Sequence, residues 1–204
     1  MSGRWWISLP GKKAVGSKWV FKLKKLPDGS IDCFKARVVA RGFTQKAGIN
    51  FTETFAPVVH FNTLRVLLAI TAMEDLELDQ VDFKSAYLNG EIEEEVYIEL
   101  PDGYKQGDKV GKLNTAIYGT RQGGNRWHAK LDQAFHHMGF TRSKVDLCLY
   151  LYQQGPIKVY IPVYVDDQLM ACNSCPHLLR QKSEDVLYKE LIQTQTHTLM
   201  LKHI

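Results

Sequence analysis

The sequence predicts an α+β fold with a mainly antiparallel sheet, and three observations favour this class. Some segments alternate apolar and polar residues with the two-residue period of a half-buried strand, and others carry the apolar stripe of an amphipathic helix. The predicted strands and helices do not alternate strictly along the chain, as they would around a parallel sheet. With 204 residues, of which 45% are hydrophobic, the chain is long enough to bury a sizeable core.

The first predicted elements form a hairpin. Residues 18–25 alternate around Trp19 and Phe21, which indicates a half-buried strand, and residues 31–40 are expected to return beside it. The segment 27–30 between them reads Pro-Asp-Gly-Ser, which is a strong turn signal. The basic side chains of this hairpin are Lys22, Lys24, Lys25, Lys35, Arg37 and Arg41.

A helix, an extended segment and a short helix are expected next. Asn62 is a suitable N-cap for a helix that runs to about residue 72. Residues 76–83 are expected to be extended. A short helix from about residue 84 should end at Asn89 and Gly90, because glycine favours the conformation that terminates a helix.

The second half of the chain predicts a helix followed by strands. Residues 125–138 place Trp127 and Phe135 on one apolar stripe. Residues 147–152, 158–165 and 168–171 read as strands, and a further helix is expected over 174–191. Pro162 lacks the N–H needed for a ladder hydrogen bond, so we expect it at a sheet edge or a bulge.

Basic residues are concentrated near the N-terminus. The first 50 residues contain eleven lysines and arginines but only two acidic residues. Such a bias is typical of a surface that meets phosphates, although a solvated basic face without a partner is the alternative. The sequence has neither the roughly 18 consecutive apolar residues of a membrane span nor a secretory signal pattern. We therefore expect a cytoplasmic or nuclear protein without a membrane partner.

Asp166 and Asp167 are adjacent carboxylates between two apolar, strand-forming runs. Aspartate is common in turns, so a solvated turn is one interpretation. The other interpretation is a divalent-metal site, because Mg²⁺ is held by carboxylates together with substrate phosphates. Such a site needs a carboxylate from elsewhere, and Asp82, at the end of an extended segment, is the candidate.

Two segments of the sequence contain these three aspartates, LELDQVDFKSAYLNGEIEEEVYIELPDGY and VYVDD. They resemble the first palm motif and the catalytic hairpin of the copia-type retrotransposon reverse transcriptases, and further segments resemble this family in order. SKWVFKLKKLPDGSIDCFKARVVARGFTQKAGINFTETFAPVV is similar to the fingers segment. AIYGTRQGGNRWHAKL resembles the third motif, and GFTRSKVDLCLY resembles the stretch before the hairpin. The resemblance extends over about residues 10–173.

The resemblance implies the fingers and palm of a right-hand polymerase within residues 10–174. The fingers would lie mostly in 10–75 and the palm mostly in 76–174, interleaved, with 175–204 as a divergent helix and tail. The family continues into a thumb and a ribonuclease H domain, so a truncated copy is expected. The implied activity is RNA-directed DNA polymerisation from deoxynucleoside triphosphates on a template-primer. The alternative is an inactive remnant that binds nucleic acid through its basic fingers.

Motif by motif, the resemblance also implies roles for single residues. Asp82, Asp166 and Asp167 match the carboxylates that hold two Mg²⁺ ions, with Mn²⁺ as a possible substitute. Tyr87 matches the aromatic steric gate that excludes a ribose 2′-hydroxyl, although a core tyrosine is the alternative. Gln122 matches a glutamine that contacts the nucleotide, whereas an isolated glutamine in a loop is more often a surface residue.

In the fingers segment, Lys35 and Arg37 match residues that contact the triphosphate, and Lys24, Lys25 and Arg41 match residues that contact the template. The alternative for several of them is a solvated charge without a partner. The third motif departs from the family at Gly123 and Gly124, where other residues are usual. The acidic run 91–95 is expected to be a solvated loop or strand end.

Overall fold

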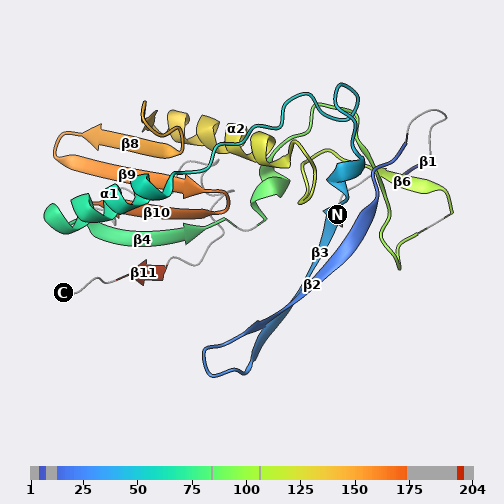
Figure 1. Ribbon diagram of the computed structural model, residues 1–204, viewed down its shortest axis with the longest axis horizontal. Helices are drawn as coiled ribbons and strands as arrows, with labels where there is room; N and C mark the ends of the chain where they lie inside the picture. Colours follow the sequence, from blue (N-terminus) through green and yellow to red (C-terminus); the bar gives the residue numbers. More distant parts are fainter. Residues whose placement is uncertain (1–4, 8–12, 84, 106, 174–196, 200–204) are drawn as a thin grey trace. The chain divides into compact units, whose positions relative to one another are not determined.

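The structure is a computed structural model that describes residues 5–7, 13–83, 85–105, 107–173 and 197–199 (Figure 1). Helices and strands are mixed, and the strands within each described sheet pair antiparallel, which confirms the α+β prediction. The chain divides into two compact units. We call Met1–Phe55 with Gly90–Trp127 the ribbon unit, and Ala56–Asn89 with His128–Ile204 the sheet unit.

The sheet unit contains a sheet whose described strands run in the order β11-β4-β10-β9-β8-β7 (Figure 1). The bounds are β4 (Glu77–Asp82), β7 (Thr141–Arg142), β8 (Leu149–Gln154), β9 (Ile157–Tyr164), β10 (Asp167–Cys172) and β11 (His197–Leu199). The predicted strands 147–152, 158–165 and 168–171 are thus confirmed within about two residues. β4 lies beside β10, although 84 residues separate the end of one from the start of the other in sequence.

Helix α1 (Phe61–Met73) packs against this sheet through a small apolar cluster. Leu67 of the helix lies with Leu78 of β4 and Ala171 of β10 in this cluster. The predicted helix is confirmed, but the predicted cap is wrong. The N-cap position is His60, so Asn62 lies inside the first turn of the helix.

Helix α2 (Gly123–His137) begins two residues before the predicted start. Its predicted apolar stripe is buried, and Trp127 and Phe135 are among the least exposed side chains. The ring centroid of Phe135 lies 4.5 Å from that of Tyr150 and 5.3 Å from that of Phe140. These aromatic contacts join the C-terminal half of α2 to β8 and to the segment that follows the helix.

Pro162 lies in β9, an interior strand between β10 and β8, so its predicted edge or bulge position is wrong. The β9–β10 ladder pairs Val163 with Gln168 and Tyr160 with Ala171, and the two β9 residues between these pairs have no assigned partner in β10. On the other side, Pro162 is paired with Leu149 of β8. The sheet accommodates the missing N–H through a local interruption of one ladder.

The ribbon unit contains the predicted hairpin as a long two-stranded ribbon of β2 (Ser17–Lys25) and β3 (Ile31–Ala40) (Figure 1). Its turn is closed by the Ser30 amide, which donates to the Asp28 carboxylate at 2.9 Å, and by Gly29 at a φ of 87°. Three short strands form a second sheet in the order β1-β6-β5. Their bounds are β1 (Trp5–Ile7), β5 (Tyr97–Glu99) and β6 (Lys109–Lys112).

Two short 3₁₀ helices complete the described elements, η1 (Gly42–Thr44) in the ribbon unit and η2 (Ala86–Asn89) in the sheet unit. The second ends at Asn89, as predicted. The helix predicted over 174–191 lies outside the described residues. Within the described part of the chain, no helix combines the length and apolarity needed to span a bilayer.

Candidate functional site

A tight turn between β9 and β10 presents the two adjacent aspartates. Tyr164 and Asp167 are directly paired, so Val165 and Asp166 are the two residues of the turn. Val165 has a φ of 55°, as the first central residue of a type II′ hairpin turn requires. A β-branched residue rarely adopts this conformation, which costs about 1–3 kcal/mol. The surrounding sheet therefore holds this turn in a conformation that its sequence disfavours.

The strand register brings the three predicted carboxylate residues to one end of the sheet. Asp82, the last residue of β4, is the direct cross-strand partner of Asp167, the first residue of β10. The amide of Phe83 then donates to the backbone oxygen of Asp166 at 3.0 Å, which fastens the turn to the end of β4. Asp82 is thus a backbone neighbour of Asp166 and Asp167, from which more than 80 positions separate it in the sequence.

Tyr87 of η2 lies close to this end of the sheet. Burial raises the pKa of its phenol, and the negative charge of Asp166 raises it further. The phenol is therefore protonated at neutral pH and does not act as a base. The structure thus brings Tyr87 and Asp166, which the family motifs assign to one site, into electrostatic contact.

The three residues at this end of the sheet are aspartates, a residue type that binds hard divalent cations. Carboxylate oxygens are the ligands that Mg²⁺ prefers in proteins. Neighbouring negative charges repel one another unless a cation or hydrogen-bond donors compensate them. The backbone register places Asp82, Asp166 and Asp167 at one end of the sheet. Among the residues that the structure describes, no group of three or more histidine, cysteine, aspartate or glutamate side chains is arranged to hold a metal ion.

The ribbon has one basic face. The cross-strand pairs are Lys22 with Lys35, Val20 with Arg37, and Lys24 with Cys33, so these side chains share a face. Two lysines directly opposite each other repel, which destabilises an antiparallel pair unless an anion lies between them. The face is therefore suited to bind phosphate groups.

The predicted residues Lys25 and Arg41 do not belong to the cross-strand pairs of the basic face. Lys25 follows a β-bulge in the ribbon, where the register shifts between Lys24 and Lys25. Arg41 follows the last residue of β3, and its amide donates to the Gly16 oxygen at 2.8 Å. The Arg37 guanidinium lies 5.5 Å from the centre of the Tyr118 ring, which limits its freedom.

The opposite face of the ribbon is apolar and largely exposed. Phe21 and Phe34 are 75% and 80% exposed, and Leu23 is paired with Phe34. At the base of the ribbon, the indole of Trp19 stacks on Phe21 with the ring centres 6.0 Å apart and donates to the Asp102 oxygen at 2.9 Å.

Gln122 is buried in the ribbon unit, with 0% of its surface exposed. Its amide nitrogen donates to the Asn50 oxygen at 2.9 Å, and its oxygen accepts a hydrogen bond from Gln45 at 3.0 Å. The structure thus places Gln122 in contact with the segment after β3. The general expectation for an isolated loop glutamine, exposure on the surface, is wrong here.

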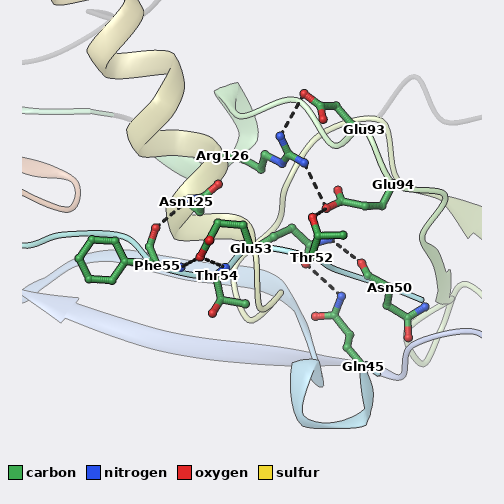
Figure 2. A network of polar contacts seen from close by, with 11 residues as sticks. Gln45, Asn50, Thr52, Glu53, Thr54, Phe55, Glu93, Glu94, Asn125 and Arg126 are labelled. Carbon is green, nitrogen blue, oxygen red and sulfur yellow. Dashed lines mark hydrogen bonds and ion pairs between the residues drawn. The ribbon is translucent and has the colours of Figure 1, made fainter. Parts of the chain in front are cut away.

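A polar cluster at the start of α2 has no counterpart in the predictions (Figure 2). The Arg126 guanidinium forms ion pairs with Glu93 at 3.0 Å and with Glu94 at 3.1 Å. Asn125 donates to the Phe55 oxygen at 2.8 Å. The run 91–95 is therefore not simply a solvated loop, because Arg126 holds two of its carboxylates. The opposite charges of Arg126 and the acidic run were visible in the sequence. No sequence pattern, however, indicates that these two segments lie next to each other.

Comparison with known proteins agrees with the motif resemblance. A family profile described as reverse transcriptase (RNA-dependent DNA polymerase) matches residues 5–188. The chain is 40% identical over 169 residues to the retrovirus-related Pol polyprotein from transposon TNT 1-94 of Nicotiana tabacum, covering 80% of this chain and 13% of the relative.

Two similar polyproteins come from Arabidopsis thaliana. The retrovirus-related Pol polyprotein from transposon RE1 is 35% identical over 175 residues, covering 84% of this chain and 12% of the relative. The one from transposon RE2 is 35% identical over 167 residues, covering 80% and 12%. The chain thus spans only 12–13% of the length of these relatives.

Proposed function

Because this chain belongs to the reverse transcriptase (RNA-dependent DNA polymerase) family, we propose that it extends a nucleic-acid primer with deoxynucleotides. Its relatives are Pol polyproteins of copia-type plant retrotransposons. The observation that supports the proposal is the strand register, which sets Asp82 opposite Asp167 and leaves Asp166 in the adjoining turn. The three residues are the proposed catalytic carboxylates.

Reverse transcriptases use a divalent metal ion, and carboxylate oxygens are the donors that Mg²⁺ prefers. When bound, such ions neutralise charge on the triphosphate and lower the pKa of the attacking primer hydroxyl. Asp82, Asp166 and Asp167 would hold them. The Phe83 amide, through its bond to the Asp166 oxygen, keeps the turn in register with β4.

Tyr87 is the proposed steric gate against ribonucleotides. Its ring is half-buried near Asp166, and the short helix η2 sets its position. Tyr87→Ala would open space for a ribose 2′-hydroxyl, whereas Tyr87→Phe would preserve the ring. Incorporation of ribonucleotides by the alanine variant but not by the phenylalanine variant is the expected result.

The ribbon is proposed to be part of the fingers, and the sheet unit the palm. Lys35 and Arg37 on the basic face would contact the triphosphate of the incoming nucleotide. Lys24, Lys25 and Arg41 would contact the template-primer. The cross-strand pairing of Lys22 with Lys35 supports an anionic partner for this face.

The test is primer extension on a poly-rA template with Mg²⁺ and labelled dTTP, using the purified chain and the Asp166→Asn variant. The matched control is Asp75→Asn, which removes one exposed carboxylate of the same unit at a position with a φ of 50°, where asparagine is tolerated. Synthesis by the wild type and the control, but not by Asp166→Asn, is expected. Extension by Asp166→Asn at the wild-type rate would refute the carboxylate assignment.

A second candidate function is nucleic-acid binding without synthesis. The basic face of the ribbon favours it, because phosphate contacts alone give sequence-independent affinity. Salt-sensitive binding by a folded chain that incorporates no dTTP with either Mg²⁺ or Mn²⁺ would select this function over the first.

A further inference from the structure

Two buried glutamines form a continuous chain of hydrogen bonds in the ribbon unit. The Arg121 amide donates to Oε1 of Gln45 at 2.7 Å, and Nε2 of Gln45 donates to Oε1 of Gln122 at 3.0 Å. Nε2 of Gln122 then donates to the Asn50 oxygen at 2.9 Å. Gln45 is 7% exposed and Gln122 is 0% exposed, so neither side chain can exchange these bonds for water without opening the structure.

The backbone groups at the two ends determine the orientation of both side-chain amides. A backbone N–H only donates, so Gln45 must offer its oxygen to Arg121 and its nitrogen to Gln122. A backbone carbonyl only accepts, so Gln122 must offer its nitrogen to Asn50. Each position therefore requires an acceptor and a donor on one planar group. Glutamate and methionine have the length of glutamine but lack the donor.

The hydrogen-bond chain joins two segments that already touch through their backbones. An added Cβ at Gly42 would lie 2.1 Å from the Gly119 oxygen, so only glycine allows this approach. The Ala40 amide also donates to the Tyr118 oxygen at 2.8 Å. The end of β3 is thus packed against the segment that leads into α2.

We propose that Gln45 and Gln122 act as one positioning pair for the nucleotide-binding part of the fingers. The pair holds the end of β3, the strand that carries Lys35 and Arg37, against the segment before α2. Gln122 acts through Gln45 and Asn50 rather than by touching the nucleotide, because its side chain is enclosed. Only the role of the pair in nucleotide binding rests on the proposed polymerase function.

Hydrogen exchange tests the pair without any need for activity. The variants are Gln45→Met, Gln122→Met and the double variant, and the control is Gln133→Met at an exposed position of α2. Exchange of the Arg121 amide should rise about tenfold in both single variants, the equivalent of one buried hydrogen bond. The Leu113 amide, which donates to the Val96 oxygen at 2.9 Å elsewhere in the ribbon unit, serves as the internal reference.

If Gln122→Met leaves the Arg121 amide protected, Gln45 does not depend on Gln122 and the pair is refuted. An equal decrease in protection at Leu113 and Arg121 would also refute it, because the variant would then have loosened the whole unit. Gln45→Glu adds a sharper comparison. Glutamate keeps the acceptor for Arg121 but cannot donate to Gln122. The Asn50 end of the chain should therefore lose protection in this variant, measured as faster exchange of the Gly48 amide, which donates to the Phe51 oxygen at 2.9 Å.

Primer extension tests the nucleotide role. Both single variants should raise KM for dTTP by a similar factor of about ten, and the double variant should be no worse than either, because the two residues act as a unit. A rise in KM for Gln122→Met alone would mean that Gln122 contacts the nucleotide directly and would refute the proposal. Failure of the wild type to incorporate dTTP would instead contradict the polymerase function and the nucleotide role, whereas the exchange result would still decide the pairing.

Discussion

The hydroxyl of Thr63 donates a 2.7 Å hydrogen bond to Oδ2 of Asp146. The same carboxylate oxygen accepts the His60 amide at 2.9 Å, and Oδ1 accepts the Cys148 amide at 2.9 Å. His60 provides no side-chain cap for α1. Asp146, which precedes β8, therefore supplies the negative charge and the acceptors that the start of this helix needs. A distant residue performs the task that the sequence assigned to Asn62.

Asp146→Ala should lower the free energy of unfolding by about 2–3 kcal/mol. The substitution leaves the His60 and Cys148 amides and the Thr63 hydroxyl without their acceptor, and unsatisfied buried donors are costly. Urea denaturation of the variant and the wild type measures the difference. Asp108→Ala, at an exposed position, is the control and should change little. Equal destabilisation by both substitutions would contradict the capping role.

The contribution of Asp146 should depend on pH in the acid range. Burial alone would raise the pKa of its carboxyl group, but the hydrogen bonds from Thr63, His60 and Cys148 outweigh burial and lower the pKa. A lowered folded-state pKa stabilises the fold above the unfolded-state pKa, and this stabilisation is lost as the pH falls through the folded-state value. The stability difference between wild type and Asp146→Asn should thus be constant from about pH 7 to pH 5 and shrink below about pH 4. A difference that grows on acidification would contradict this.

Local pattern predicted most of the longer described elements. The ribbon strands β2 and β3, helices α1 and α2, and the hairpin of β9 and β10 all carry clear periodicity, and each is present within about two residues of its prediction. The short strands β5 and β6 are too brief to show a period, and they exist because each pairs with the other. The prediction for Pro162 was wrong because the preference of proline for sheet edges takes no account of the neighbouring strands. In the structure, Pro162 is paired with Leu149 of β8 inside the sheet.

The candidate site, too, was predictable from the sequence only in part. The family motifs predicted that Asp82, Asp166 and Asp167 belong together, and the register of β4 and β10 makes them neighbours. No local pattern pairs Gln45 with Gln122 across 77 positions or Glu94 with Arg126 across 32. Such contacts depend on how loops pack, and loops carry no periodicity that a single sequence displays.

Gly90→Ala should destabilise the protein by upward of about 2 kcal/mol, because the added methyl group has no room. A Cβ at this position would lie 2.7 Å from the Trp127 nitrogen and 2.8 Å from the carbonyl carbon of Arg126, and a helix backbone cannot move aside easily. Gly111→Ala is the matched control, since its Cβ would meet nothing nearer than 3.4 Å. Thermal denaturation of both variants measures the contrast, and similar melting temperatures would contradict the predicted clash.

Arg126→Met should cost about 2–4 kcal/mol, because it leaves the Glu94 carboxylate, which is only 13% exposed, without its cation. Lys105→Met breaks an ion pair of similar length, 2.8 Å, with Asp102, but both partners are exposed and little change is expected. Chemical denaturation compares the two variants. A smaller destabilisation by Arg126→Met than by Lys105→Met would show that the first pair is also effectively solvated.

The basic face of the ribbon should determine how binding to a primer-template depends on salt. Binding that releases counterions gives a plot of log affinity against log salt concentration whose slope has a magnitude of about 0.9 per neutralised phosphate. Lys22→Gln with Lys35→Gln should therefore reduce that magnitude by about 1.8 if each lysine neutralises one phosphate. Fluorescence anisotropy with a labelled duplex at several salt concentrations measures it. Lys144→Gln, an exposed lysine of the sheet unit, is the control. Slopes that are equal for wild type and the double variant would show that this face does not contact nucleic acid, whereas weaker binding of one sequence only would indicate base recognition instead of phosphate binding.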